Sequence, residues 1–143
     1  MLAKEFLKKI ITIDELINCK IEQVKDLRDS LSSVSSNLSA DKVQSSANPD
    51  RFTNTIAKII DLEAEINRDI DRLVDYKKMA RDLIEQMDTD IEKIILYKRY
   101  FEGKTFEKIS VECGYSWRQT HRLHSQALQN LNVVIVSHNV KVI

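Results

Sequence analysis

The sequence predicts an all-α fold: a long antiparallel, coiled-coil-like helical hairpin over residues 1–87, followed by shorter helices over residues 88–131. Only two glycines and one proline occur among 143 residues, so few residues suit the tight turns of a β-protein. Leucine, isoleucine, lysine and the acidic residues, which favour long helices, dominate the composition. Apolar residues also recur in alternating steps of four and three, the repeat of helices that pack along one seam.

The first predicted helix covers residues 2–31, where Lys20 takes one polar seam position. Residues 32–48 contain seven serines, whose side chains compete for backbone hydrogen bonds, so this segment is expected to be a flexible connection. The apolar seam consists of Phe6, Ile10, Ile13, Ile17, Val24, Leu27 and Leu31.

The second predicted helix follows Asn48, a favourable N-cap, and begins at Pro49, which suits the first helical position. Glu63 and Lys77 interrupt its seam, and polar seam residues often fix register or partner. The seam consists of Phe52, Ile56, Ile59, Ile66, Ile70, Leu73, Ala80, Ile84 and Met87. Other apolar residues predict packing on the C-terminal unit or on a second copy of the chain: Ile11, Ile21, Ile60, Leu62 and Val74.

Residues 88–131 are expected to hold three helices. Asp88 is the predicted cap between the second and third helices, and Gly103 is expected to end the third in the left-handed conformation. Thr105 should cap a short helix over residues 106–112. The third helix is expected to bury an apolar face of Ile91, Ile94, Ile95, Tyr97 and Tyr100.

The segment from 105 to 131 has the layout of a helix-turn-helix. Gly114 breaks the short helix, and Ser116 with Gln119 forms a capping box that opens the last helix, residues 117–131. The two helices are expected to pack through Ile109 and Val111 on the first and Thr120, Leu123, Ala127 and Leu128 on the second. For residues 132–143, a short strand, a docked apolar tail and a frayed end stay open, and a long helix is not expected.

The outward side of the last helix carries groups suited to DNA. Arginine binds guanine edges, glutamine binds adenine edges, and the other side chains reach phosphates or thymine methyl groups. The predicted DNA-binding residues are Trp117, Arg118, Gln119, His121, Arg122 and Ser125. Two alternatives stay open: a helical packing module whose exposed face is only polar, and a protein-docking role for Trp117.

The chain has no net charge, but its 22 basic and 22 acidic residues are unevenly distributed. Residues 1–87 hold 14 basic against 16 acidic residues, whereas residues 88–143 hold 8 against 6. No acidic residue follows Glu112, so the last helix carries no charge that repels DNA. The C-terminal part is therefore the electropositive end of the chain.

The sequence contains no catalytic, metal-binding or cofactor-binding pattern, and the protein is not expected to be an enzyme. Cys19 and Cys113 lack zinc-ligand spacing and fit free thiols in a reducing cytoplasm. His121 and His124 are expected to contact phosphate or to lie on the surface rather than to bind metal. Because no apolar run is long enough to span a membrane, the protein is expected to be cytoplasmic, without a membrane partner.

Acidic residues of the second helix, between 61 and 71, alternate with basic ones. This spacing predicts ion pairs within one helix rather than an acid–base catalytic pair. The residues concerned are Asp61, Glu63, Glu65, Asp69 and Asp71, with Lys58, Arg68 and Arg72.

Residues 92–131 resemble region four of the bacterial primary sigma factors. Shared features are a Tyr-Phe-x-Gly-like turn after an apolar helix, Thr-Phe-Glu-Lys-Ile, Gly-Tyr-Ser, and a last helix that closes with Ala-Leu-x-x-Leu. In that family the outer positions of the last helix contact the promoter −35 element. The resemblance carries this role over to Trp117, Arg118, Gln119, His121 and Arg122. The sequence departs from the family at Trp117 and His121, where basic residues are usual.

The whole chain, including VQSSANPDRF at 43–52, is similar to small phage and prophage proteins of Gram-positive bacteria, among them the ArpU-like late-gene regulators. The resemblance implies a transcription regulator that binds double-stranded DNA, while its hairpin self-associates or contacts RNA polymerase. The chain lacks a region for a −10 element, so a complete sigma factor is not expected. Two other roles stay open: a DNA-packaging adaptor similar to a small terminase subunit, and a polymerase-binding module that makes no DNA contact.

Overall fold

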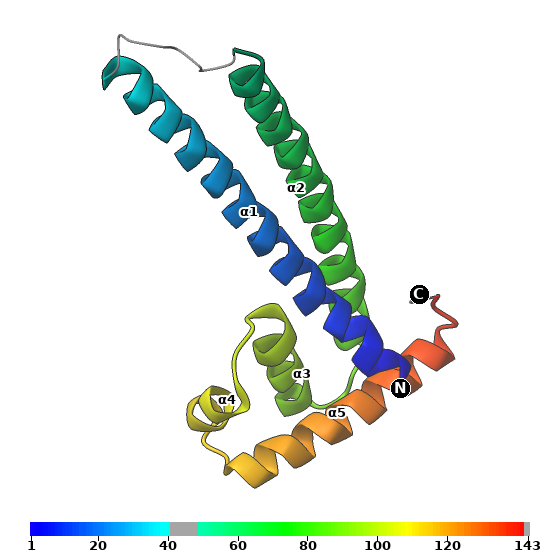
Figure 1. Ribbon diagram of the computed structural model, residues 1–143. Coiled ribbons are helices and arrows are strands. Elements are labelled where there is room, and N and C mark those ends of the chain that lie inside the picture. Colours follow the sequence, from blue (N-terminus) through cyan, green and yellow to red (C-terminus); the bar gives the residue numbers. More distant parts are fainter. Residues whose placement is uncertain (41–48, 142–143) are drawn as a thin grey trace. The chain divides into compact units, whose positions relative to one another are not determined.

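A computed structural model describes residues 1–40 and 49–141, with side chains described for 1–33 and 50–141. These residues form helices and no strand, so the prediction of an all-α fold is confirmed (Figure 1). None of the described helices has the length and apolar character needed to cross a membrane. The elements are α1 (Leu2–Ala40), α2 (Pro49–Ile84), α3 (Asp90–Leu96), the π-helix η1 (Tyr97–Phe101), α4 (Phe106–Cys113) and α5 (Trp117–Ser137).

Helix α1 continues to Ala40, so the prediction that a connection begins at residue 32 is wrong. A serine in a helix costs less than about 0.7 kcal/mol relative to alanine, which is too little to end a helix by itself. The remaining serines of the predicted connection and the predicted cap Asn48 lie outside the described residues. Helix α2 begins at Pro49, as predicted.

The chain forms two compact units, one of residues 1–13 with 73–143 and one of residues 14–72. In the second of these, ion pairs join α1 and α2. Lys20 Nζ lies 2.5 Å from Asp69 Oδ2 and 3.4 Å from Glu65 Oε2, and Arg28 pairs with Glu63. The residue later in α1 pairs with the residue earlier in α2, so the two helices are antiparallel at these pairs.

Glu63, Glu65 and Asp69, three of the acids for which ion pairs within α2 were predicted, contact basic residues of α1. The hydrogen bond from Lys20 to Asp69 raises the pKa of Lys20 above its ordinary value. The polar seam position at Lys20 therefore has a partner across the helix pair, as expected for a residue that fixes register.

Helix α2 carries two apolar stripes where one seam was predicted. Ile59 and Ile66, seven residues apart, are buried, whereas Phe52, Ile56 and Ile70 are exposed. The prediction is therefore wrong for these three positions. The predicted series of steps of three and four included residues from two adjacent faces of the helix, of which only one is buried. Of the residues predicted to pack elsewhere, Ile11 and Leu62 are half-buried, and Ile21, Ile60 and Val74 are exposed.

In the first unit, the start of α1 and the end of α2 share a core with α3, α4 and α5. Helices α3 and α4 both pack on α5 (Figure 1). The backbone N–H of Ala3 donates to Asn132 Oδ1 at 3.4 Å, which joins α1 to α5. Large side chains almost entirely removed from solvent in this unit are Phe6, Leu7, Ile10, Ile84, Ile95, Leu96, Ile109, Leu131 and Ile135.

Helix α5 extends to Ser137, so the expectation that residues after 131 would not continue a long helix is wrong. Leu128, Leu131 and Ile135 are buried at steps of three and four, so the apolar stripe of α5 runs on into this segment. Burial of this stripe outweighs the weak preference of β-branched residues for strands. Residues 142–143 lie outside the described part.

The start of α3 also differs from the prediction. Thr89, not Asp88, is the N-cap residue of α3. Glu92, in the first turn, is buried, and both of its carboxylate oxygens accept from Asn130 Nδ2, at 3.0 and 2.8 Å. Ile94, predicted to be buried, is exposed, and the buried position is Leu96. A hydrogen bond between side chains thus joins α3 to α5 beside the core.

Candidate nucleic-acid interface

Helices α4 and α5 are separated by a short turn, and each helix begins at the capping residue that was predicted for it. Thr105 Oγ1 accepts from the Lys108 N–H at 3.3 Å, and Ser116 Oγ accepts from the Gln119 N–H at 3.1 Å. Gly114 adopts φ 72° and ψ 26°, a left-handed conformation that ends α4 and that side chains disfavour. Gly103, with φ 65°, fulfils the same prediction after η1.

The contact of α4 with α5 is built around Ile109. Ile109 is fully buried, as are Thr120 and Ala127 on α5, while Leu123 is half-buried. Val111 is 81% exposed, so the prediction that it packs against α5 is wrong. Residues two apart in a helix point to different sides, and burial of Ile109 therefore turns Val111 outward.

The outer face of α5 begins with Arg118, Arg122 and Ser125, which are all exposed. Steps of four and three continue this face to Gln129, also exposed and missed among the predicted contacts, although the same period would have found it. Within the described residues neither arginine forms an ion pair. Gln119, the next predicted contact, is half-buried at the edge. The face is therefore basic and polar, without an acid.

Trp117 and His121 belong to a cluster of planar side chains at the start of α5. Their ring centroids lie 4.0 Å apart, and the His121 centroid lies 4.1 Å from that of Phe106, with the rings tilted in both pairs. The guanidinium carbon of Arg99 lies 4.5 Å from the Phe106 centroid and extends the cluster to η1. Trp117 remains 55% exposed, whereas His121 is half-buried and its Nε2 has no hydrogen-bond partner. Contact with His121 thus places Trp117 at the edge of the outer face.

His124 is a core residue, which corrects the prediction of a phosphate contact or a surface position. It is buried, its Nε2 lies 2.9 Å from the Tyr100 hydroxyl, and its ring meets Phe106 edge-on at 4.9 Å. Burial, together with the nearby positive charge of Arg99, lowers the pKa of His124 to about 4. Burial also raises the pKa of Tyr100. Both groups are therefore neutral at pH 7, and the hydroxyl and Nε2 share one hydrogen bond.

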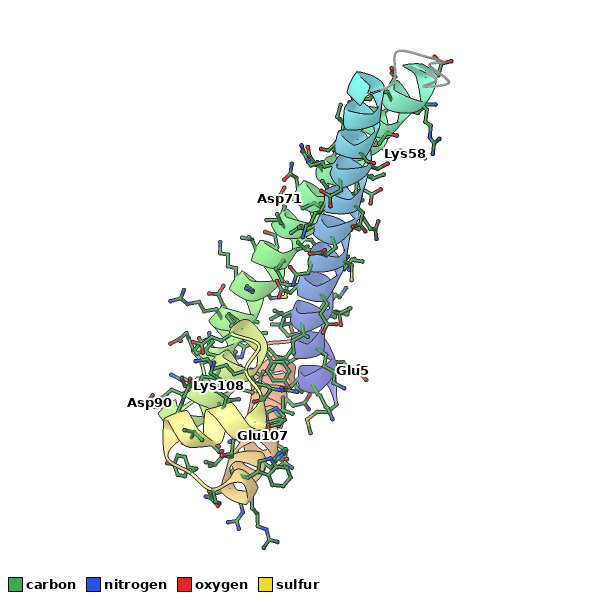
Figure 2. All side chains as sticks on the ribbon, turned by 60° about the vertical axis from the view of Figure 1, so that its left-hand side comes forward. Glu5, Lys58, Asp71, Asp90, Glu107 and Lys108 are labelled. Atoms are coloured by element: carbon green, nitrogen blue, oxygen red, sulfur yellow. The ribbon has the colours of Figure 1, made fainter. Side chains whose placement is uncertain are left out.

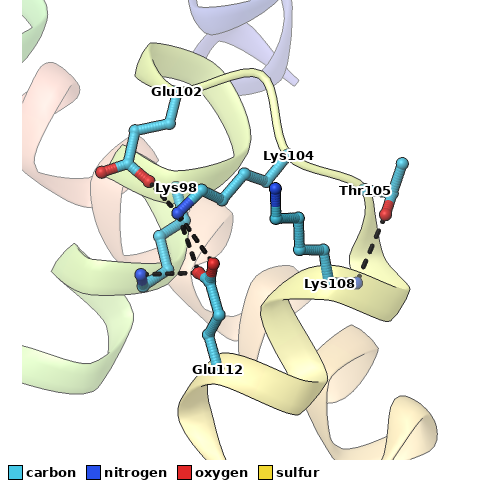
Figure 3. A network of polar contacts seen from close by, with 6 residues as sticks. All are labelled: Lys98, Glu102, Lys104, Thr105, Lys108 and Glu112. Atoms are coloured by element: carbon cyan, nitrogen blue, oxygen red, sulfur yellow. Dashed lines mark hydrogen bonds and ion pairs between the residues drawn. The ribbon is translucent and has the colours of Figure 1, made fainter.

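A network of lysines surrounds the last acid of the chain, Glu112 on α4 (Figure 3). Lys98 and Lys104 lie 2.8 and 2.9 Å from Glu112 Oε2, and Lys104 also pairs with Glu102 at 2.9 Å. The hydrogen bonds from Lys98 and Lys104 lower the pKa of Glu112 to about 2, so its carboxylate stays ionised. The network therefore balances the negative charge of Glu112 within the protein.

The two helices differ in the charge that they present. Helix α4 exposes Glu107 and Lys108 next to each other in sequence (Figure 2), so its outer side carries both signs. Helix α5 carries arginines and no acid. An anionic partner is therefore expected to meet α5 first.

No family model, curated protein or solved structure matches this chain. Among the described residues, no group of three or more histidine, cysteine or acidic side chains is arranged to hold a metal ion.

Proposed function

We propose that α4, the turn at Gly114 and α5 form a helix-turn-helix that binds double-stranded DNA, with α5 in the major groove. The observation that carries this proposal is the acid-free outer face of α5, where Arg118, Arg122 and Ser125 are exposed beside a sharply bent turn. The major groove admits an α-helix, and an exposed arginine without an ion-pair partner on such a helix can donate hydrogen bonds to guanine or phosphate.

The separate residues support distinct contacts. Arg118 and Arg122, four residues apart, lie on the same side of the helix and suit base edges or phosphates along one groove. Ser125 and Gln119 offer neutral polar groups, and the Trp117 ring offers an apolar surface of the kind that meets a thymine methyl group. For His121, held between two rings, a lesser role in base contact is expected.

We assign α1 and α2 to a helical hairpin and the whole chain to a transcription regulator of phage or prophage type. The antiparallel ion pairs of Lys20 and Arg28 support the hairpin, and the resemblance of residues 92–131 to sigma region four supports the promoter as target. A regulator of this kind binds a short specific site far more tightly than random DNA.

A polymerase-binding module without DNA contact is the second candidate, and the exposure of Trp117 favours it. Tryptophan is enriched among the residues that dominate protein interfaces. The ring contact between Trp117 and His121 is equally suited to anchor a protein partner.

Selection of bound sites from a pool of random double-stranded DNA, at near-physiological salt, tests the proposal. We expect one short sequence to be enriched, and its affinity to fall as salt rises, with a slope of a few phosphate contacts. Absence of enrichment, together with binding to RNA polymerase, would replace the first candidate by the second.

A further inference from the structure

The exposed side of α2 in the unit of residues 14–72 forms a second coiled-coil seam. Four of its members are large apolar residues with much of their surface in solvent: Phe52 is 40% exposed, Ile56 36%, Ile60 60% and Ile70 41%. With two polar residues, Glu63 and Asn67, they follow one line along the helix. We call these six residues the outer stripe.

The residues of the outer stripe have the spacing of a helix face that packs on another helix in a coiled coil. From Ile56 to Ile70 its members follow in steps of four, three, four and three, the heptad repeat. The stripe is about 27 Å long at 1.5 Å per residue. The buried seam with Ile59 and Ile66 lies beside it on the same helix, so α2 can pack on α1 and on one further helix at once.

The outer stripe contains only one charged residue, although α2 as a whole is rich in charged residues. Its one charged residue, Glu63, is paired with Arg28 of the same chain. The charged residues of this part of α2 that lie off the stripe include Arg51, Lys58, Asp61, Glu65 and Arg68, of which Lys58 is labelled in Figure 2. A neutral face suits contact with an identical face, because a net charge there would repel its own copy.

Asn67 indicates which arrangement of two copies fits. Ile60 and Asn67, seven residues apart, occupy the heptad position that in parallel two-stranded coiled coils prefers β-branched residues and tolerates one asparagine. The asparagine amide both donates and accepts, so two copies of Asn67 that face each other can hydrogen-bond. The neighbouring Ala57 and Ala64 are exposed and small, which leaves room for the α1 of the other copy.

We propose that the outer stripe binds a second copy of this chain, with the two α2 helices parallel and in register so that Asn67 meets Asn67. The length of the stripe places this interface at the low end of sizes for specific dimers, so the dimer is reversible and forms at micromolar concentration. This proposal does not rest on DNA binding, and it is tested without DNA.

Sedimentation equilibrium of the full chain over a range of micromolar concentrations tests the dimer. We expect a monomer–dimer equilibrium for the wild type. Ile60→Lys, which sets two like charges face to face, is expected to raise the dissociation constant at least about tenfold. Asn54→Lys adds the same charge at an exposed position of α2 off the stripe and is the matched control, expected to leave the constant unchanged. Circular dichroism checks that both variants keep their helices.

A mixing experiment tests the register. Asn67→Lys and Asn67→Asp are each expected to dissociate more readily than the wild type when alone, and to form a dimer when mixed, because opposite charges then face each other. A wild-type chain that stays monomeric would overturn the proposal, and so would equal average masses for Ile60→Lys and Asn54→Lys. A dimer that Asn67→Lys and Asn67→Asp do not restore on mixing would overturn the parallel, in-register arrangement.

Discussion

The hydroxyl of Tyr100 in η1 and Nε2 of His124 in α5 lie 2.9 Å apart and form a buried hydrogen bond. Burial keeps the imidazole neutral by lowering its pKa to about 4 from the ordinary 6.5. The bond links α5, which carries the exposed arginines, to η1. The protonation state of His124 therefore affects the stability of the first unit.

The free energy of unfolding is expected to fall as pH falls from about 6.5 toward 4. In this range the unfolded chain binds a proton at His124 that the folded chain does not, so acid favours unfolding. The loss is on the order of 2 kcal/mol once solvent screening is allowed for. Urea titrations at pH 7, 6, 5 and 4.5, followed by circular dichroism, measure it.

His124→Gln is the informative variant because it keeps an acceptor for Tyr100 and removes the titrating ring. We expect a flatter stability profile between pH 6.5 and 4.5 than in the wild type. His138→Gln changes an exposed histidine near the end of α5 and serves as control, with the wild-type profile. The same slope in His124→Gln and in the control would show that His124 does not govern this range.

Asn130→Leu is expected to destabilise the protein by about 2–4 kcal/mol, because the buried Glu92 carboxylate loses the amide that donates to both of its oxygens. Glu92→Gln removes the charge and keeps an acceptor, so a smaller loss of about 1 kcal/mol is expected. Denaturant unfolding at pH 7 compares them. A larger loss in Glu92→Gln than in Asn130→Leu would contradict this account.

Ile135→Ala is expected to cost about 2–5 kcal/mol, since it opens a cavity in the core of the first unit. The adjacent Val136→Ala is a matched control with an expected change below about 0.5 kcal/mol. Ile135 is 1% exposed and Val136 63% exposed, on the same helix. Thermal and urea unfolding of the two variants test whether residues after 131 belong to the folded core.

Arg118→Ala and Arg122→Ala are each expected to weaken binding to the selected DNA site by about 1–3 kcal/mol. Both side chains are exposed and form no ion pair within the described residues, so the unfolding free energy should stay within about 0.5 kcal/mol of the wild type. Arg51→Ala, an exposed arginine of α2, is the control. Wild-type affinity in both arginine variants would remove the DNA-binding face as proposed.

Local rules predicted the parts of the fold that depend on neighbouring residues. Thr105 and Ser116 cap α4 and α5, and Gly103 and Gly114 take positive φ, because these effects act within one turn. The apolar seam positions of α1 from Phe6 to Val24 are buried, as the heptad repeat predicted, whereas Ala3 and Leu7 are buried outside that seam. The exposed Arg118 and Arg122 were predictable because the apolar stripe of α5 fixes its opposite side.

The remaining features depend on contacts between distant residues. His124 lies four residues after Thr120 and four before Leu128, so the period of α5 places it on the buried side, but only Tyr100 and Phe106, from other elements, explain how its polar ring is accommodated there. Ile135 is helical because a core is available for it, against its own propensity. Glu63 pairs with Arg28 of α1 and Glu65 with Lys20, and the spacing within α2 does not indicate these contacts.

The union of residues 1–13 with residues 73–143 in one unit has a consequence for synthesis. Ala3 leaves the ribosome long before Asn132, which accepts its backbone hydrogen bond. The apolar side of the first turns, with Phe6 and Ile10, must therefore wait without its partners while the rest of the chain is translated. The unit can close only after Asn132 has left the ribosome, and until then the nascent chain exposes an apolar segment of the kind that chaperones bind.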